Sequence, residues 1–112
     1  MAVRLAKPWR PLDEAAVAAL PGQLGVYQVA DADGTVVRIG AAGARELFGL
    51  RSALSRELKQ WGAGHRFRLE VTTAYHTRWQ ELLMVHVHDH GALPAGNQSD
   101  RPTRLGRLSP GG

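Results

Sequence analysis

Two runs of β-forming residues, separated by a short turn, constrain the fold of this chain more than any other feature. The runs cover residues 25–30 (GVYQVA) and 35–40 (TVVRIG), and the turn between them ends in Asp33-Gly34. Glycine accepts the positive φ that tight hairpin turns require. The two runs are therefore predicted to pair as an antiparallel hairpin.

A third strand is predicted over residues 67–73. In this segment Phe67, Leu69 and Val71 alternate with charged residues. Such alternation is typical of a strand with one buried face and one face in water.

Two helices are predicted before this strand. Residues 13–22 (DEAAVAALPG) form a short helix that Asp13 caps and that the Pro-Gly pair ends. Residues 45–61 carry apolar side chains at spacings of three and four, which indicates a helix with one apolar stripe. That stripe consists of Leu47, Leu50, Leu54, Leu58 and Trp61.

A last helix is predicted over residues 78–90. Thr77 and Gln80 fit a capping box at its start, and Gly91 ends it. The order of elements predicts an α/β fold of the α+β type, with a small, mainly antiparallel three-stranded sheet and flanking helices. We expect one domain over residues 1–98, followed by a mobile basic tail over residues 99–112, which has few apolar side chains.

Composition narrows the class of protein. The chain has no cysteine, which excludes disulfides and thiolate metal sites. No apolar stretch approaches the ~20 residues that a membrane-spanning helix needs, so no membrane partner is expected. The first residues, MAVRLAKPWRPL, lack the apolar run of a secretory signal, and a cytoplasmic location is expected.

The net charge of +4 is concentrated at the two ends of the chain. Between Leu20 and Asn97, eight basic residues stand against seven acidic ones, which leaves a charge of only +1 there. The surplus lies before and after this segment, in residues 4–10 and 101–107. Basic ends of this kind bind phosphate backbones through counterion release, so nucleic acid is a candidate partner.

Several short motifs occur in an order that resembles the GIY-YIG nuclease domain family. Residues 20–21 (LP) and 25–27 (GVY) resemble the opening segment of that family, and residues 38–40 (RIG) stand where its YIG triplet is found. A helix with an arginine, a strand, and a helix followed by residues 94–97 (PAGN) come next. The resemblance covers residues 20–97 and implies a hydrolase, an endonuclease that cleaves phosphodiester bonds with a divalent metal ion.

The resemblance implies a role for three residues. Tyr27 matches the first-motif tyrosine, which activates water, and Asn97 matches the closing asparagine, which fixes local geometry. Arg51 lies on the helix whose arginine steadies the phosphate. It also interrupts the apolar stripe of that helix, where a charged side chain must be paired or must open onto a ligand cavity. We therefore expect Arg51 to line a pocket together with Tyr27.

Two positions depart from the family pattern. Arg38 replaces the YIG tyrosine, and a guanidinium that is always protonated cannot act as a general base. It remains able to bind an anion. Ser55 stands one turn after Arg51, where the family often has tyrosine or histidine. Arg38, Ser55 and Asn97 are thus expected to bind ligand rather than to react.

The metal ligand has two candidates on the last helix, Glu81 and His86. Glu81 is the acidic residue that the motif suggests. Helical geometry instead places His86, with His90 one turn later, on the inner face beside Trp79, and Glu81 roughly opposite. In that register His86 faces Tyr27. A Glu81 site would suit magnesium or manganese, and a His86 site manganese, nickel or zinc.

Two functional hypotheses follow. The first is a metal-dependent phosphodiesterase that acts on nucleic acid through Tyr27, Arg51 and either Glu81 or His86. The second is a repurposed domain that no longer cuts and binds nucleic acid or another anion in the same pocket, or performs other chemistry there with His86. We expect no extra recognition domain in a chain this short, and substrate specificity would then come from a partner or from a homo-oligomer.

Overall fold

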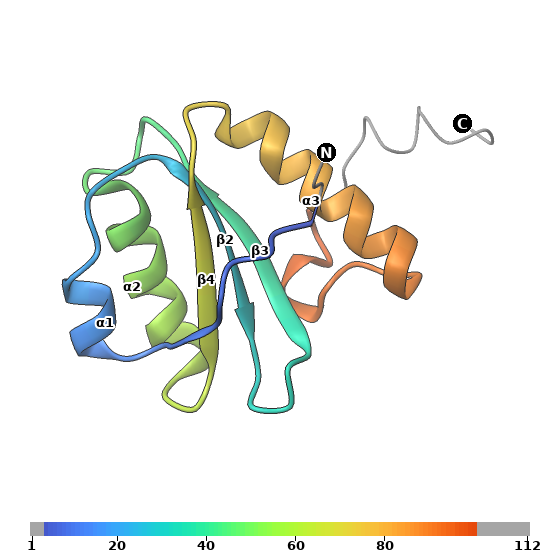
Figure 1. Ribbon diagram of the computed structural model, residues 1–112, viewed down its shortest axis with the longest axis horizontal. Coiled ribbons are helices and arrows are strands. Elements are labelled where there is room, and N and C mark those ends of the chain that lie inside the picture. Colours follow the sequence, from blue (N-terminus) through green and yellow to red (C-terminus); the bar gives the residue numbers. More distant parts are fainter. Residues whose placement is uncertain (1–3, 101–112) are drawn as a thin grey trace.

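The computed structural model describes residues 4–100, which form an antiparallel sheet with helices on both faces (Figure 1). In chain order the elements are β1 (Arg10–Pro11), α1 (Glu14–Ala18), β2 (Gly25–Ala30), β3 (Val36–Ala42), α2 (Gly49–Trp61), β4 (Arg66–Val71), α3 (Tyr75–His90) and the 3-10 helix η1 (Ala95–Asn97). The strand order is β1-β4-β2-β3. The α+β class is confirmed, with four strands instead of the three expected.

The predicted hairpin is present as β2 and β3. Tyr27 pairs with Gly40 and Gln28 with Ile39, and β4 pairs with the other edge of β2. Sequence patterns missed β1 because it has only two residues, which pair with Phe67 and Arg66 at the sheet edge. Pro11 has no N–H to donate, and an edge strand tolerates that loss.

Two helix starts differ from the sequence predictions. α2 begins at Gly49 rather than at residue 45, and Leu47 is 84 % exposed, so it does not belong to the apolar stripe. α3 begins at Tyr75, which places Thr77 inside its first turn and makes the capping-box prediction wrong. The predicted ends are correct: Gly91 ends α3 in the left-handed conformation, with φ of 81°.

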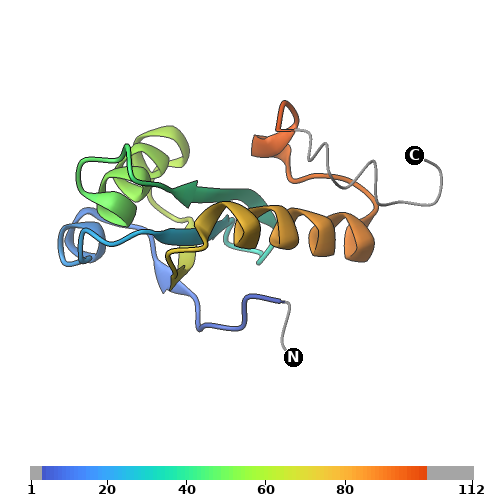
Figure 2. The same ribbon diagram turned by 90° about the horizontal axis from the view of Figure 1, so that it is seen from above.

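The sheet separates two apolar clusters. Tyr27, Val29 and Phe67 pack with α1 and α2 on one face, while Val26 and Ile39 pack with α3 on the other. Figure 2 shows α3 lying apart from α1 and α2. Because neighbouring strand residues point to opposite faces, a side chain beside Tyr27 cannot also contact α3. This alternation decides which candidate residues meet.

The end of the described chain is bound to the sheet. Asp100, which the sequence analysis assigned to the tail, accepts a hydrogen bond from Arg38 at 2.6 Å. Residues 101–112, which make up the rest of the predicted tail, lie outside the described residues. Within residues 4–100 no helix has the length and apolar character needed to cross a membrane.

Candidate functional site

A buried carboxylate lies at the centre of the site. Glu57, on the sheet-facing side of α2, is 9 % exposed. Its Oε2 accepts a hydrogen bond from the Tyr27 hydroxyl at 2.6 Å, and its Oε1 accepts one from the Trp61 indole at 2.9 Å. Arg38 Nε lies 3.4 Å from Oε2. Glu57 is therefore compensated by three donors, as a buried charge must be.

Arg38 connects this carboxylate to the end of the described chain. Its Nη1 donates to the Gly96 carbonyl at 2.8 Å and to Asp100 Oδ2 at 2.6 Å. The guanidinium thus lies between two carboxylates, those of Glu57 and Asp100. Arg38 therefore holds η1 against the edge of the sheet.

The hydroxyl of Tyr27 is committed to this network. The side chain is 2 % exposed. Burial, and then the negative charge of Glu57, raise the pKa of Tyr27 far above its ordinary value. Tyr27 therefore stays protonated and acts as a hydrogen-bond donor.

Asn97 completes the edge of the sheet with its side chain. Its Oδ1 accepts a hydrogen bond from the Ile39 N–H, and its Nδ2 donates to the Ile39 carbonyl, both at 2.8 Å. Nδ2 also donates to Asp100 at 2.9 Å. The amide replaces a neighbouring strand for one residue of β3. Asn97 is fully buried and does not line the nearby cavity between β3, α2 and η1, so the expectation that it binds ligand is wrong.

We expect Asn97→Ala to lower the free energy of unfolding by about 2 kcal/mol, because it leaves the buried N–H of Ile39 without its acceptor and the Ile39 carbonyl with the Trp79 indole as its remaining donor. Chemical denaturation measures the change. Gln98→Ala is the matched control, since its exposed amide bonds only loop carbonyls. Equal and small effects of the two substitutions would contradict the conclusion that the Asn97 side chain stabilises the edge of β3.

An open cavity of about 430 Å³ lies over this network, at the junction of β3, α2 and η1. Its polar lining comes from Arg38, Arg56, Glu57 and Gln60, with Trp61 and the backbone of Ala95 and Gly96 completing the wall. Arg56 forms an ion pair with Glu46 through a side chain that is 60 % exposed. Arg56 binds Glu46 through both Nη1 and Nη2, so a ligand at Arg56 would compete with this carboxylate.

Arg51 and Ser55 line a different cavity. It measures about 920 Å³ and lies between α1 and α2. The Arg51 guanidinium packs over the Phe48 ring, 4.6 Å from its centroid. The expectation that Arg51 shares a pocket with Tyr27 is wrong, because the side of α2 that faces the sheet carries Leu54 and Glu57, and Arg51 points toward α1.

Neither metal candidate on α3 approaches Tyr27. Glu81 forms an ion pair with Arg78, which also pairs with Glu70. His86 lies on the opposite face of the sheet from Tyr27, in a small cavity that His90 shares. The expectation that His86 faces Tyr27 and Arg51 is therefore wrong, although its placement on the inner side of α3 and the absence of Glu81 from that side are correct.

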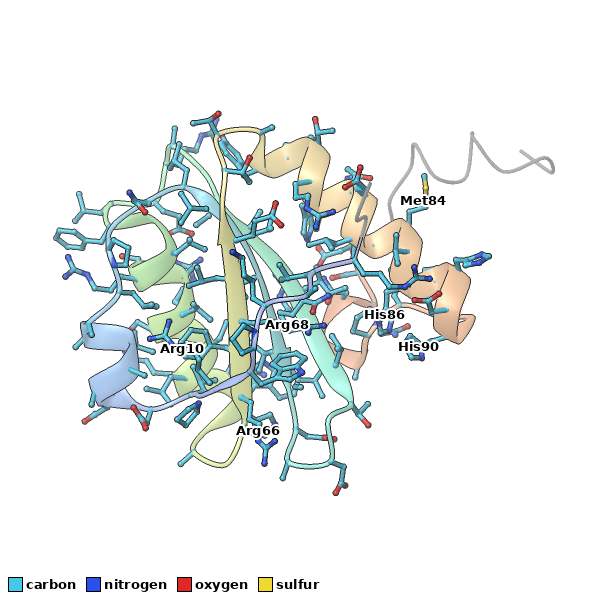
Figure 3. The ribbon with its side chains drawn as sticks, in the orientation of Figure 1. Arg10, Arg66, Arg68, Met84, His86 and His90 are labelled. Atoms are coloured by element: carbon cyan, nitrogen blue, oxygen red, sulfur yellow. The ribbon has the colours of Figure 1, made fainter. Side chains whose placement is uncertain are left out.

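The metal expected from the resemblance has no complete donor set in the described part of the chain. The rings of His86 and His90 lie 4.4 Å apart (Figure 3), but Asp89 beside them is bound by Arg4. Nowhere in residues 4–100 do three histidine or carboxylate side chains converge. The described residues therefore do not fit the metal centre that the resemblance implies.

Sequence reasoning missed Glu57, Arg56, Trp61 and Asp100 as members of the site. One signal was present: Glu57 interrupts the apolar stripe of α2 three residues after Leu54, which is the same argument that selected Arg51. No pattern in the sequence pointed to Asp100, because its contact with Arg38 depends on the path by which the chain returns to β3.

The fold and the site define a small α+β protein with a polar pocket at one edge of an antiparallel sheet. The chain belongs to the family described as a domain of unknown function, DUF7508, which matches residues 3–89. The match ends before η1 and Asp100, which complete the pocket. No curated protein and no solved structure matches the chain.

Proposed function

We propose that this chain is a divergent GIY-YIG-like domain that binds a phosphate-bearing ligand in the pocket between β3, α2 and η1 without hydrolysing it. The order of the motifs and the antiparallel arrangement of the hairpin with β4 support the likeness to that family. The observation that carries the proposal is the buried hydrogen bond from Tyr27 to Glu57, at 2.6 Å.

This hydrogen bond argues against the water-activating role. A tyrosine that activates water must present its oxygen to the reacting centre, within hydrogen-bond reach of it. The Tyr27 hydroxyl is instead buried and bonded to a carboxylate. The second motif offers Arg38, which cannot accept a proton. Both tyrosine positions of the resemblance are thus occupied by groups suited to structure and to charge recognition.

Two arginines support recognition of phosphate. Arg56 reaches the pocket from the exposed side of α2, and Arg38, which already pairs with Glu57 and Asp100, reaches it from β3. Guanidinium groups bind phosphate through paired, charge-assisted hydrogen bonds. A phosphate that displaced Glu46 would accept the same two hydrogen bonds from Arg56 and would bring more negative charge to them.

The experiment uses inorganic phosphate and bis(4-nitrophenyl) phosphate as probes. In a titration followed by ¹H–¹⁵N NMR, both should shift the indole N–H signal of Trp61, which lines the pocket, and leave that of Trp79 in place, since Trp79 bonds to Ile39 on the other face. Arg56→Ala should weaken binding at least tenfold. The matched control is Arg45→Ala, an exposed arginine with no ion pair in residues 4–100.

Hydrolysis is measured in parallel as release of 4-nitrophenol and as nicking of nucleic acid, with magnesium, manganese, nickel and zinc. We expect no turnover. Metal-dependent cleavage that Glu81→Ala or His86→Ala abolishes would contradict the proposal and would support the phosphodiesterase hypothesis instead. Binding that is equally strong in the Arg56 and Arg45 variants would also contradict it.

A further inference from the structure

Cationic side chains gather at the edge of the sheet opposite the phosphate pocket. Arg66 and Arg68 lie on β4, and Arg10 lies on the edge strand β1 that pairs with it. Arg66 and Arg68 point to the face of the sheet that the N-terminal segment crosses (Figure 3), whereas the Arg10 guanidinium reaches around the sheet edge and lies over the Phe67 ring, 5.1 Å from its centroid. Trp9 joins them, with its ring against Arg68. We call these four residues the cationic strip.

The strip carries charge that the described chain does not neutralise. The arginines with carboxylate partners within residues 4–100 are Arg4, Arg38, Arg56 and Arg78. None of the three arginines of the strip has one among those residues. The charge of the strip is therefore available to an external anion.

Arg68 is the clearest case. Its Nε donates to Gln28 Oε1 at 2.7 Å, and its guanidinium stacks 4.1 Å from the centroid of the Trp9 ring. Burial lowers the pKa of Arg68, and no carboxylate offsets that effect. The guanidinium is held in place by neutral groups, which leaves its charge uncompensated and its orientation fixed.

A cavity at the end of the strip is shaped by aromatic rings. It measures about 530 Å³, and its wall includes Trp9, His65, Arg10 and Arg66. The Nδ1 atom of His65 is buried and has no hydrogen-bond partner in the described chain. Asp13 also borders the cavity, but its carboxylate accepts a hydrogen bond from Ala16 N–H and caps α1. Two rings, an unpartnered polar atom and two cations thus meet in one recess.

We propose that the cationic strip binds single-stranded nucleic acid, with phosphates at Arg66 and Arg68 on one face of the sheet, a base in the recess beside Trp9 and His65, and a further phosphate at Arg10 where the recess reaches the sheet edge. Unstacked bases bind to aromatic side chains while the backbone follows a positive groove. A duplex keeps its bases stacked inside and would leave the recess unused. An acidic protein would satisfy the arginines but would not need the rings.

This strip is separate from the phosphate pocket, which lies at the β3 edge of the sheet. Trp61 lines the pocket, but its ring also contacts His65 of the recess, with 5.7 Å between the centroids, so the Trp61 signal does not distinguish the two sites. The variants distinguish them: Arg56→Ala should weaken phosphate binding and leave oligo(dT) binding unchanged, whereas Arg10→Glu/Arg66→Glu should do the reverse. The two proposals therefore fail independently.

The test is fluorescence anisotropy on the full chain with a labelled 15-nucleotide oligo(dT) and a 15-base-pair duplex. We expect the single strand to bind more tightly. The slope of log K against log salt should be about −2, because three phosphate contacts at −0.7 each predict that value. Trp9→Ala should weaken binding to oligo(dT) roughly tenfold, as expected for loss of one stacked base.

The decisive variant is Arg10→Glu/Arg66→Glu, compared with Arg45→Glu/Lys59→Glu. The two double variants change net charge equally and keep residues 101–112, so only the position of the charge differs. We expect the first to weaken binding more than tenfold beyond the second. Both pairs of side chains are exposed, so neither substitution should prevent folding, and circular dichroism verifies this.

Three results would overturn the proposal. The first is equal weakening by both double variants, which would assign binding to net charge or to the chain ends. The second is equal affinity for the duplex with an unshifted indole N–H signal of Trp9. The third is tight binding of poly-glutamate that depends on Arg10 and Arg66 when oligo(dT) does not bind, which would make the partner an acidic protein.

Discussion

Replacing Glu57 with alanine is expected to lower the free energy of unfolding by about 4 kcal/mol, a large part of the 5–15 kcal/mol typical of a small domain. The substitution removes the acceptor of the Tyr27 hydroxyl and of the Trp61 indole at once. It also leaves the partly buried guanidinium of Arg38 with Asp100 as its only carboxylate partner among the described residues. Urea denaturation measures the loss.

The matched control is Glu46→Ala. Glu46 also pairs with an arginine, but that arginine, Arg56, is 60 % exposed. Exposed ion pairs contribute about 0–1 kcal/mol, so this variant should be nearly as stable as the parent. A Glu57→Ala protein as stable as Glu46→Ala would show that the buried network does not hold the fold together.

Glu57→Gln separates charge from hydrogen bonding. The amide oxygen still accepts one of the two hydrogen bonds, while its NH₂ group faces a donor. We expect Glu57→Gln to lower the free energy of unfolding by less than Glu57→Ala does. A loss as large as that of alanine would mean that the negative charge opposite Arg38 is the main contribution.

The second large effect is expected at Gly40, the glycine of the RIG triplet. Gly40→Ala should lower the free energy of unfolding by about 3 kcal/mol, because overpacking and a displaced hydrogen bond add. A Cβ atom at this position would lie 2.3 Å from Cζ and 2.3 Å from the hydroxyl oxygen of Tyr27. The Tyr27 ring cannot move away from this Cβ without breaking its hydrogen bond to Glu57.

A double-mutant cycle tests this cause. In a Tyr27→Leu background the ring is absent, and Gly40→Ala should then cost less than about 1 kcal/mol, so that the two substitutions couple strongly. Gly34→Ala is the control. At Gly34 an added Cβ meets nothing within 4 Å, and only the positive φ of 89° opposes it. Additive effects of the Gly40 and Tyr27 changes would contradict the contact.

Much of the fold could be read from local patterns. The Asp33-Gly34 turn predicted the hairpin, alternation after Arg66 predicted β4, and Gly91 predicted the end of α3. These features depend on backbone preferences of a few consecutive residues, which the sequence displays directly. β1 could not be predicted, because two residues are too few to show a pattern and are a strand only by their pairing with β4.

The candidate site was predicted in part. Tyr27, Arg38 and Asn97, three of the residues that the motifs selected, lie around the β3 edge. Arg51 and His86 do not join them. A difference of one residue along a strand moves a side chain to the other face, and a few residues along a helix rotate it toward another neighbour. Such placements depend on which faces pack together.

The sequence by itself determined most of the strands and helices, namely the β2–β3 hairpin, β4 and the three α-helices. The tertiary structure alone decided that Glu57 is the partner of Tyr27 and Arg38, and that Asp100 returns to the same edge. The reason is physical. A buried charge is tolerated only where donors from several elements converge, and that convergence arises when α2 and η1 pack against the sheet.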